Sequence, residues 1–123
     1  MLQQTIQLFN DKEEELVSLL VGIGMKRPVA RMLVYLARKS EATSREIERG
    51  ADLREPEVSN AVKHFTRLGW IRDRKIPSDR KGKPVRSIAL ALPAGHILDI
   101  IGKKKMEETR SQVALIRKLG NSM

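Results

Sequence analysis

Apolar positions recur every three or four residues over most of this chain, with one alternating stretch between the helical ones. The first set predicts an amphipathic helix over about residues 2–22, in which Asn10–Asp11 is a place where an N-cap could restart the helix. Pro28 then stands where the first turn of a helix accepts proline, and an apolar stripe continues to about Lys39. These two segments give an N-terminal helix followed by the first helix of a core that we expect over residues 25–92.

Two shorter helices come next, and their spacing predicts a helix-turn-helix. Thr43 and Glu46 form a T-x-x-E capping box at the start of the first one, and Gly50 ends it within two turns. The second, over residues 55–68, has Pro56 in its first turn. Its apolar residues fall on one helical face, namely Val58, Ala61, Val62, Phe65 and Leu68. Two short helices joined by a glycine-bearing turn are the pattern of a helix-turn-helix.

After Gly69 the pattern becomes typical of strands. Residues 70–76 and the alternating segment 85–92 predict two strands, and the polar sequence SDRKGKP between them predicts a turn. Together they form a hairpin with a wing at about 77–85. A final helix is expected over 94–119, and because no repeat or linker interrupts the chain, we expect one domain over residues 1–123.

The charge pattern favours a polyanionic partner. Lys and Arg number 24 against 15 Asp and Glu, so the net charge is +9, and such a basic protein is attracted to nucleic acid. Residues 72–86 hold seven basic and two acidic side chains, a net +5. Basic residues also protect sheet edges from aggregation, but that purpose rarely needs so many charges at one loop tip.

Other classes of function find little support. The absence of cysteine excludes disulfides, thiolate metal sites and a cysteine nucleophile, and the two histidines, His64 and His96, lack the spacing of metal ligands. No phosphate-binding glycine loop or activated nucleophile is present, so we expect no enzyme, no metal and no cofactor. No apolar run approaches the roughly 20 residues that span a bilayer, so we expect no membrane partner and a soluble, cytoplasmic, nucleoid-associated protein.

The order of these elements resembles the winged helix-turn-helix of prokaryotic, archaeal-type regulators of the TrmB, ArsR and MarR families. The matching stretches are GMKRPVARMLVYLARKSEATSREIERGADL, REPEVSNAVKHFTRLGWI and the wing RDRKIPSDRKGKPVRSIAL, within residues 22–92. In that pattern a Val-Ser pair, here Val58–Ser59, leads into Leu68–Gly69–Trp70–Ile71. The resemblance implies a mainly α fold with a small β-hairpin and long N- and C-terminal dimerisation helices. The chain after the wing is too short for the sugar-binding domain of larger TrmB-type regulators, so sugar sensing is not carried over.

A winged helix places its second helix-turn-helix helix in the major groove, where Asn, Lys and Glu side chains can read base edges. The candidate DNA contacts are Arg45, Arg54, Glu57, Ser59, Asn60, Lys63, His64, Arg67, Arg74, Arg80, Lys81 and Lys83. Arginine is a poor N-cap, so Arg54 is expected to point at a phosphate instead. A polar helix face is also ordinary solvated surface, but its position before a basic wing favours DNA contact.

The two ends of the chain predict a dimer. A helix over 94–119 would extend about 39 Å at about 1.5 Å per residue, which is more than a winged-helix core needs. We expect the terminal helices to pair across a two-fold axis through Leu2, Ile6, Phe9, Met106, Val113, Ile116 and Leu119. The alternative is that these helices fold back on their own domain.

The sequence thus predicts a homodimeric, sequence-specific regulator of transcription that binds double-stranded DNA, with repression as the expected mode. Two alternatives stay open. One is an abundant protein that coats DNA without sequence preference, mainly through the charge of its wing. The other is a winged helix that contacts a protein within a larger assembly. No residue pattern identifies a small-molecule effector.

Overall fold

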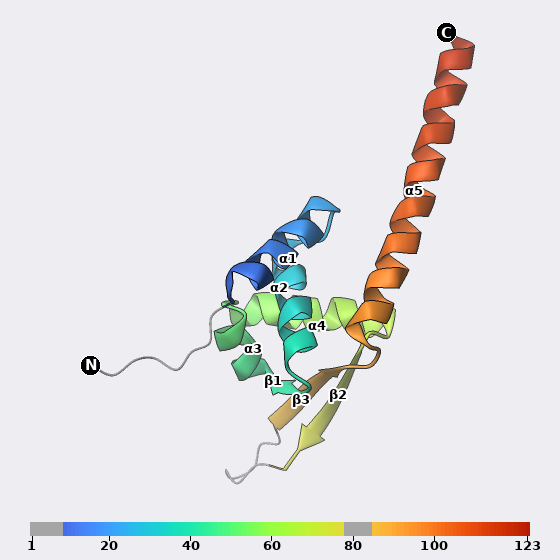
Figure 1. Cartoon of the computed structure of the whole chain (residues 1–123). Coiled ribbons are helices and arrows are strands. Elements are labelled where there is room, and N and C mark those ends of the chain that lie inside the picture. Colours follow the sequence, from blue (N-terminus) through green and yellow to red (C-terminus); the bar gives the residue numbers. More distant parts are fainter. Residues whose placement is uncertain (1–8, 78–84) are drawn as a thin grey trace. The chain divides into compact units, whose positions relative to one another are not determined.

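A computed structural model describes residues 9–77 and 85–123 of the chain (Figure 1). The chain forms two compact units, residues 1–93 and residues 94–123. The first contains, in order, α1 (Asp11–Gly22), α2 (Arg27–Arg38), β1 (Ala42–Thr43), α3 (Ser44–Gly50), α4 (Glu55–Leu68), β2 (Ile71–Ile76) and β3 (Val85–Leu90). The second is one helix, α5 (Ala94–Ser122). This mainly helical fold with a small antiparallel sheet confirms the predicted winged helix-turn-helix.

Local side-chain contacts fix where the helices begin. Asn10 accepts a hydrogen bond from the Glu13 backbone N–H at 2.8 Å, and the Glu13 carboxylate accepts one from the Asn10 N–H at 2.9 Å. Thr43 and Glu46 make the same reciprocal pair at the start of α3. Both caps were predictable, because each needs only two residues three positions apart. The first part of the predicted helix 2–22, with Leu2 and Ile6, lies outside the described residues.

Helix α2 is the centre of the first unit, since it packs against α1, α3 and α4. Its buried residues are Ala30, Met32, Leu33, Val34, Tyr35 and Leu36. From α4, Val58, Ala61 and Phe65 are buried as predicted. Leu68, on the same helical face, is 40% exposed. Leu68 ends the helix, and Gly69, with φ of 75°, turns the chain toward β2.

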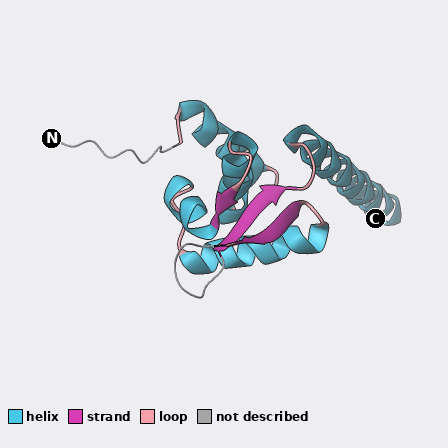
Figure 2. Cartoon of the chain, turned by 90° about the horizontal axis from the view of Figure 1, so that it is seen from below, coloured by secondary structure: helices cyan, strands magenta, loops and turns pink. Residues whose placement is uncertain are grey.

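The strands form a three-stranded antiparallel sheet in the order β1-β3-β2 (Figure 2). The hairpin of β2 and β3 was predicted, but β1 was not, because two residues carry no periodic signal. Cα partners across the hairpin include Asp73 with Ile88 and Arg74 with Ser87. Because side chains alternate along a strand, Asp73 and Ile88 share one face of the sheet and Arg74 and Ser87 share the other.

Helix α5 extends three residues beyond the predicted end at 119. Several of its large apolar side chains are exposed, including Met106 (58%), Ile116 (66%) and Leu119 (61%). A helix in water usually buries such an apolar stripe. These exposed side chains therefore form a surface that could contact another molecule. No helix within the described part of the chain is both long and apolar enough to cross a membrane.

Arg31 of α2 ties three segments of the first unit together. Its Nε donates to the Ala51 carbonyl oxygen at 2.6 Å, and its Nη1 lies 3.0 Å from Glu14 Oε1 of α1. The guanidinium carbon also lies 4.6 Å from the centre of the Phe9 ring, and that of Arg38 lies 5.5 Å from it. Phe9, which we had expected at a dimer interface, is therefore 8% exposed and packs against two arginines of its own chain.

A glycine allows the close approach of α3 to α2. A Cβ built on Gly50 would lie 2.1 Å from Cε1 of the Tyr35 ring, and that tyrosine is only 4% exposed. Gly50 thus ends α3 in sequence and also leaves room for a buried ring.

We expect Gly50→Ala to lower the free energy of unfolding by about 1–3 kcal/mol, because the added methyl group forces the Tyr35 ring to move in a packed core. Chemical denaturation measures this change. Gly22→Ala is the matched control, since nothing lies within 4 Å of a Cβ there. Because alanine favours helix over glycine by about 1 kcal/mol, the control should be neutral or stabilising. Equal effects of the two substitutions would contradict the packing argument.

A second ion pair joins β2 to the segment before β1. Arg74 Nε and Nη2 donate to the Glu41 carboxylate at 2.8 and 3.1 Å. The hydrogen bond from Arg74, followed by one from the Ser87 hydroxyl, lowers the pKa of Glu41 from its ordinary value of 4.5 to about 2. Among charges in water such a pair is weak, but its bidentate geometry makes it specific.

The stability due to Glu41 should depend on pH. The unfolded chain protonates this carboxylate below about pH 4.5, whereas the folded chain keeps it ionised down to about pH 2. The contribution is therefore complete above pH 4.5 and is lost as the pH falls toward 2. In denaturation curves, the difference between wild type and Glu41→Gln should shrink over this interval. A difference that stays constant down to the lower pH would contradict the assignment.

Candidate nucleic-acid interface

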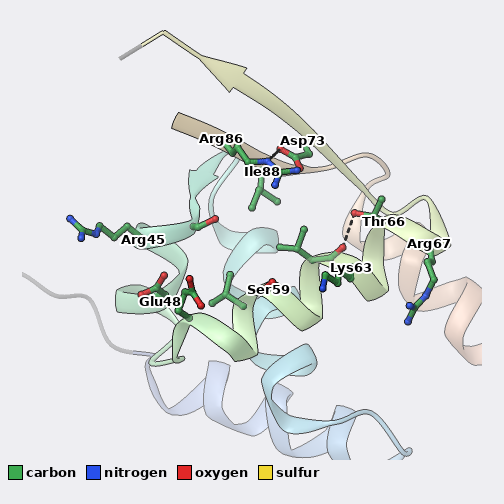
Figure 3. A pocket seen from close by; sticks show the side chains of 13 residues that line it. Arg45, Glu48, Ser59, Lys63, Thr66, Arg67, Asp73, Arg86 and Ile88 are labelled. Atoms are coloured by element: carbon green, nitrogen blue, oxygen red, sulfur yellow. Dashed lines mark hydrogen bonds and ion pairs between the residues drawn. The ribbon is translucent and has the colours of Figure 1, made fainter. Parts of the chain in front are cut away.

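One face of the first unit carries a groove of about 760 Å³ between the helix-turn-helix and the sheet (Figure 3). Its apolar lining comes from Val58, Val62 and Ile88. The polar and charged lining comes from Ser44, Arg45, Glu48, Glu55, Ser59, Lys63, Thr66, Arg67, Asp73 and Arg86. The groove therefore brings together α3, α4 and both strands of the hairpin, the elements that the sequence predicted to meet DNA.

Helix α4 separates its polar candidates into two rows. Ser59, Lys63 and Arg67, at spacings of four, line the groove. Asn60 and His64 are exposed on a neighbouring row and do not line it. Residues four apart lie on one side of a helix, so each row presents a continuous edge. The opposite side of α4 is buried in the core, so both rows are held on a fixed support.

The start of α4 involves two further candidates. The Arg54 backbone N–H donates to Glu57 Oε1 at 2.9 Å, so the Glu57 carboxylate holds the helix start. Arg54 occupies the N-cap position and its side chain is exposed, without a capping bond of its own. This arrangement leaves the Arg54 guanidinium at the positive end of a helix, where anions are favoured. Glu57 therefore caps the start of α4, whether or not its side chain also contacts a base.

The hairpin places its charged residues on two different faces. Asp73 and Arg86 line the groove and form an ion pair with each other. Arg74, a candidate contact, lies on the opposite face and is bound by Glu41. Arg86 was not among the candidates, although strand alternation would have placed it on the same face as Ile88. The other wing candidates, Arg80, Lys81 and Lys83, lie outside the described residues.

The charges in the groove are mixed. Four basic residues, Arg45, Lys63, Arg67 and Arg86, share it with the carboxylates of Glu48, Glu55 and Asp73. Arg45 comes from the first turn of α3, and Figure 3 shows it at one end of the site. A groove of mixed charge attracts phosphates less strongly than an unbroken row of basic residues. It favours ligands whose charges match the positions of its own charges.

The described residues contain no group of three or more His, Asp or Glu that could hold a metal ion. His64 lies on the outer row of α4, with its ring centre 5.9 Å from that of Phe65. The polar side chains that line the groove are of the kinds that recognise bases and phosphates.

Comparison with known proteins agrees with this geometry. The model of the MarR family matches residues 23–82. Among solved structures, a possible transcriptional regulator from Methanosarcina mazei Go1 has a TM-score of 0.62 and 12% identity, over 85% of both chains. No curated protein matches the chain.

Two further structures share the fold. TrmBL2, an archaeal chromatin protein described as having a novel mode of DNA binding, has a TM-score of 0.63 and 16% identity, over 90% of this chain and 40% of that one. MepR, a transcription regulator of the Staphylococcus aureus multidrug efflux pump MepA, has a TM-score of 0.52 and 16% identity, over 83% and 73%. The family model matches just under half of the chain, and on a fold shared with these proteins it makes residues 23–82 similar to the winged helix-turn-helix of the MarR family.

Proposed function

We propose that this protein is a sequence-specific repressor that binds double-stranded DNA as a homodimer. The observation that carries the proposal is the row Ser59–Lys63–Arg67, which lies on the groove side of a helix whose other side is fixed in the core. In a winged helix this helix enters the major groove. Repression follows if the bound dimer blocks access to a promoter.

Each candidate has a role in this arrangement. Lys63 suits the O6 and N7 atoms of guanine, Asn60 suits adenine, and Ser59 can pair with several groups. Arg45 and Arg54, near the starts of α3 and α4, suit backbone phosphates. The basic wing residues Arg80, Lys81 and Lys83 would bind flanking phosphates or a narrow minor groove. Glu57, His64 and Arg67 complete the proposed contacts; Arg74, which Glu41 binds on the face of the sheet opposite the groove, is left out of them.

The dimer is proposed from α5. Its exposed stripe of Met106, Val113, Ile116 and Leu119 has spacings of seven, three and three residues, as in a helix-helix seam. Burying such a stripe against a second copy removes apolar surface from water, and a two-fold dimer can then bind two half-sites about 34 Å apart or a multiple of that. Leu2 and Ile6 are the proposed N-terminal contribution, without Phe9, which is buried in its own chain. Such a protein would act in the cytoplasm, on the nucleoid.

The proposal is tested by fluorescence anisotropy with the DNA upstream of the protein's own gene and with a scrambled duplex. Specific regulators typically prefer their site by about 10³ or more at physiological salt. A preference of that size supports the proposal. Equal affinities that fall together between about 50 and 200 mM salt would show a DNA coat without sequence preference.

That second function has its own support. The sequence concentrates a net +5 in residues 72–86, and the chain shares its fold with an archaeal chromatin protein. Binding through phosphates alone needs no more than such charge. If neither duplex binds at low salt, the DNA proposal fails and a protein partner becomes the better hypothesis.

We expect Lys63→Ala to weaken binding to the specific duplex by about 1–3 kcal/mol and to relax base preference at one position, because Lys63 would contact a base edge. Anisotropy with single-base variants of the site measures both effects. Lys12→Ala is the control, since it removes the same charge from an exposed position on α1. Equal weakening by the two substitutions would show that only total charge matters.

We expect Ile116→Glu to convert the dimer to a monomer, because each protomer loses the burial of an isoleucine, worth about 1.5–3 kcal/mol, and gains an unpaired charge in the seam. Sedimentation velocity over a range of concentrations measures the change. Ser111→Glu adds the same charge on the far side of α5 and should leave the dimer intact. A wild-type protein that sediments as a monomer would refute the dimer directly.

A further inference from the structure

The groove contains an ion pair between the two strands of the hairpin. Arg86 of β3 donates from Nε to Asp73 Oδ1 of β2 at 3.2 Å, and its Nη2 contacts Asp73 Oδ2. The two residues are diagonal neighbours on one face of the hairpin, since Asp73 lies opposite Ile88. Figure 3 shows the pair above the groove, across from Lys63 and Ser59 of α4.

The two partners differ in their access to solvent. The Arg86 side chain is 63% exposed, whereas that of Asp73 is 19% exposed. A phosphate that approaches the groove therefore reaches the arginine easily, but the arginine already has a carboxylate bound on its inner side. Binding a phosphate with full strength requires the guanidinium to leave this carboxylate.

The stability that the ion pair contributes does not account for an aspartate at position 73. Aspartate is disfavoured in strands, and a cross-strand ion pair with so exposed an arginine contributes about 0–1 kcal/mol. Asp73 and Asp79 are also the only acidic residues in the basic segment 72–86. In a segment suited to binding phosphates, a carboxylate placed beside a cation lowers the charge available to DNA.

We propose that Asp73 is a specificity-determining residue of the DNA-binding groove. It binds Arg86 in the free protein, so DNA obtains this arginine only by displacing a carboxylate. Non-specific affinity comes almost entirely from phosphate contacts, whereas specific affinity has base contacts in addition. Base contacts fix how the protein lies on its specific site, whereas a complex without them can settle wherever the exposed cations best reach phosphates. Masking Arg86 therefore lowers non-specific affinity by the larger factor. The inference rests on the proposed binding of DNA.

The chain offers a matched control in the pair of Glu41 and Arg74. This pair is also a carboxylate that binds an arginine of the hairpin, at 2.8 Å, but on the face of the sheet opposite the groove. Asp73→Asn and Glu41→Gln each remove one negative charge and release one arginine. They differ in whether that arginine lies in the groove.

The test measures binding of wild type, Asp73→Asn and Glu41→Gln to the upstream and scrambled duplexes over a range of salt. With Asp73→Asn we expect at least about threefold tighter binding to the scrambled duplex at low salt, and a logarithmic salt slope steeper by about 0.9, the value for one added phosphate contact. The preference for the specific site should fall. Adding Arg86→Ala to Asp73→Asn should restore the wild-type slope, and Glu41→Gln should leave it unchanged.

Other outcomes overturn the inference. If Asp73→Asn leaves the slope unchanged, or if Glu41→Gln changes it equally, Asp73 has no special role in binding. A change confined to the melting temperature would show a structural role only. These failures leave the proposed function intact, because wild type still binds. If wild type binds neither duplex, the proposed function and the inference both fail. If wild type binds both equally, there is no preference for Asp73 to determine, and the inference fails while DNA binding stands.

Discussion

The bond from Arg31 to the carbonyl oxygen of Ala51 holds the helix-turn-helix in its shape. The last carbonyl groups of a helix have no partner within it, and a cation is favoured at that end. Here the cation comes from α2 and reaches the end of α3, where Asp52 adopts a positive φ of 55° and begins the turn to α4. Because Glu14 and Phe9 hold the same guanidinium, the angle at which α4 leaves the turn depends on contacts with α1 as well.

This arrangement connects α1 to α4 within the first unit. Helix α1 does not line the groove, but it contacts the residue that fixes the turn before α4. A displacement of α1 would have to break or carry along the Arg31 contacts, and so would change how α4 is presented. The other arginine beside Phe9, Arg38, is bound by Glu13, so the start of α1 is secured twice. The groove side of α4 is thus coupled to α1 by contacts that mutation can remove one at a time.

Much of the fold could be predicted from the sequence because its signals are local. Capping boxes need residues three apart, and the face of α4 needs only helical spacing, which also places Ser59, Lys63 and Arg67 together. The features that were missed involve residues far apart in the chain. The two residues of β1 pair with β3, Gly50 meets Tyr35, and Asp73 meets Arg86 only in one register of the hairpin. No periodicity encodes these contacts, because they depend on how the elements pack.

The order of the strands gives the basic residues of β2 a second role. Among the described strands β2 is an outer one, with β3 on one side and none on the other. Exposed strand edges can pair with another molecule, and natural proteins prevent this with charged side chains. Arg72, Arg74 and Lys75 supply such charges along β2. Loss of these basic residues during evolution would therefore make the protein more prone to aggregate. This holds even for positions that never contact a nucleic acid.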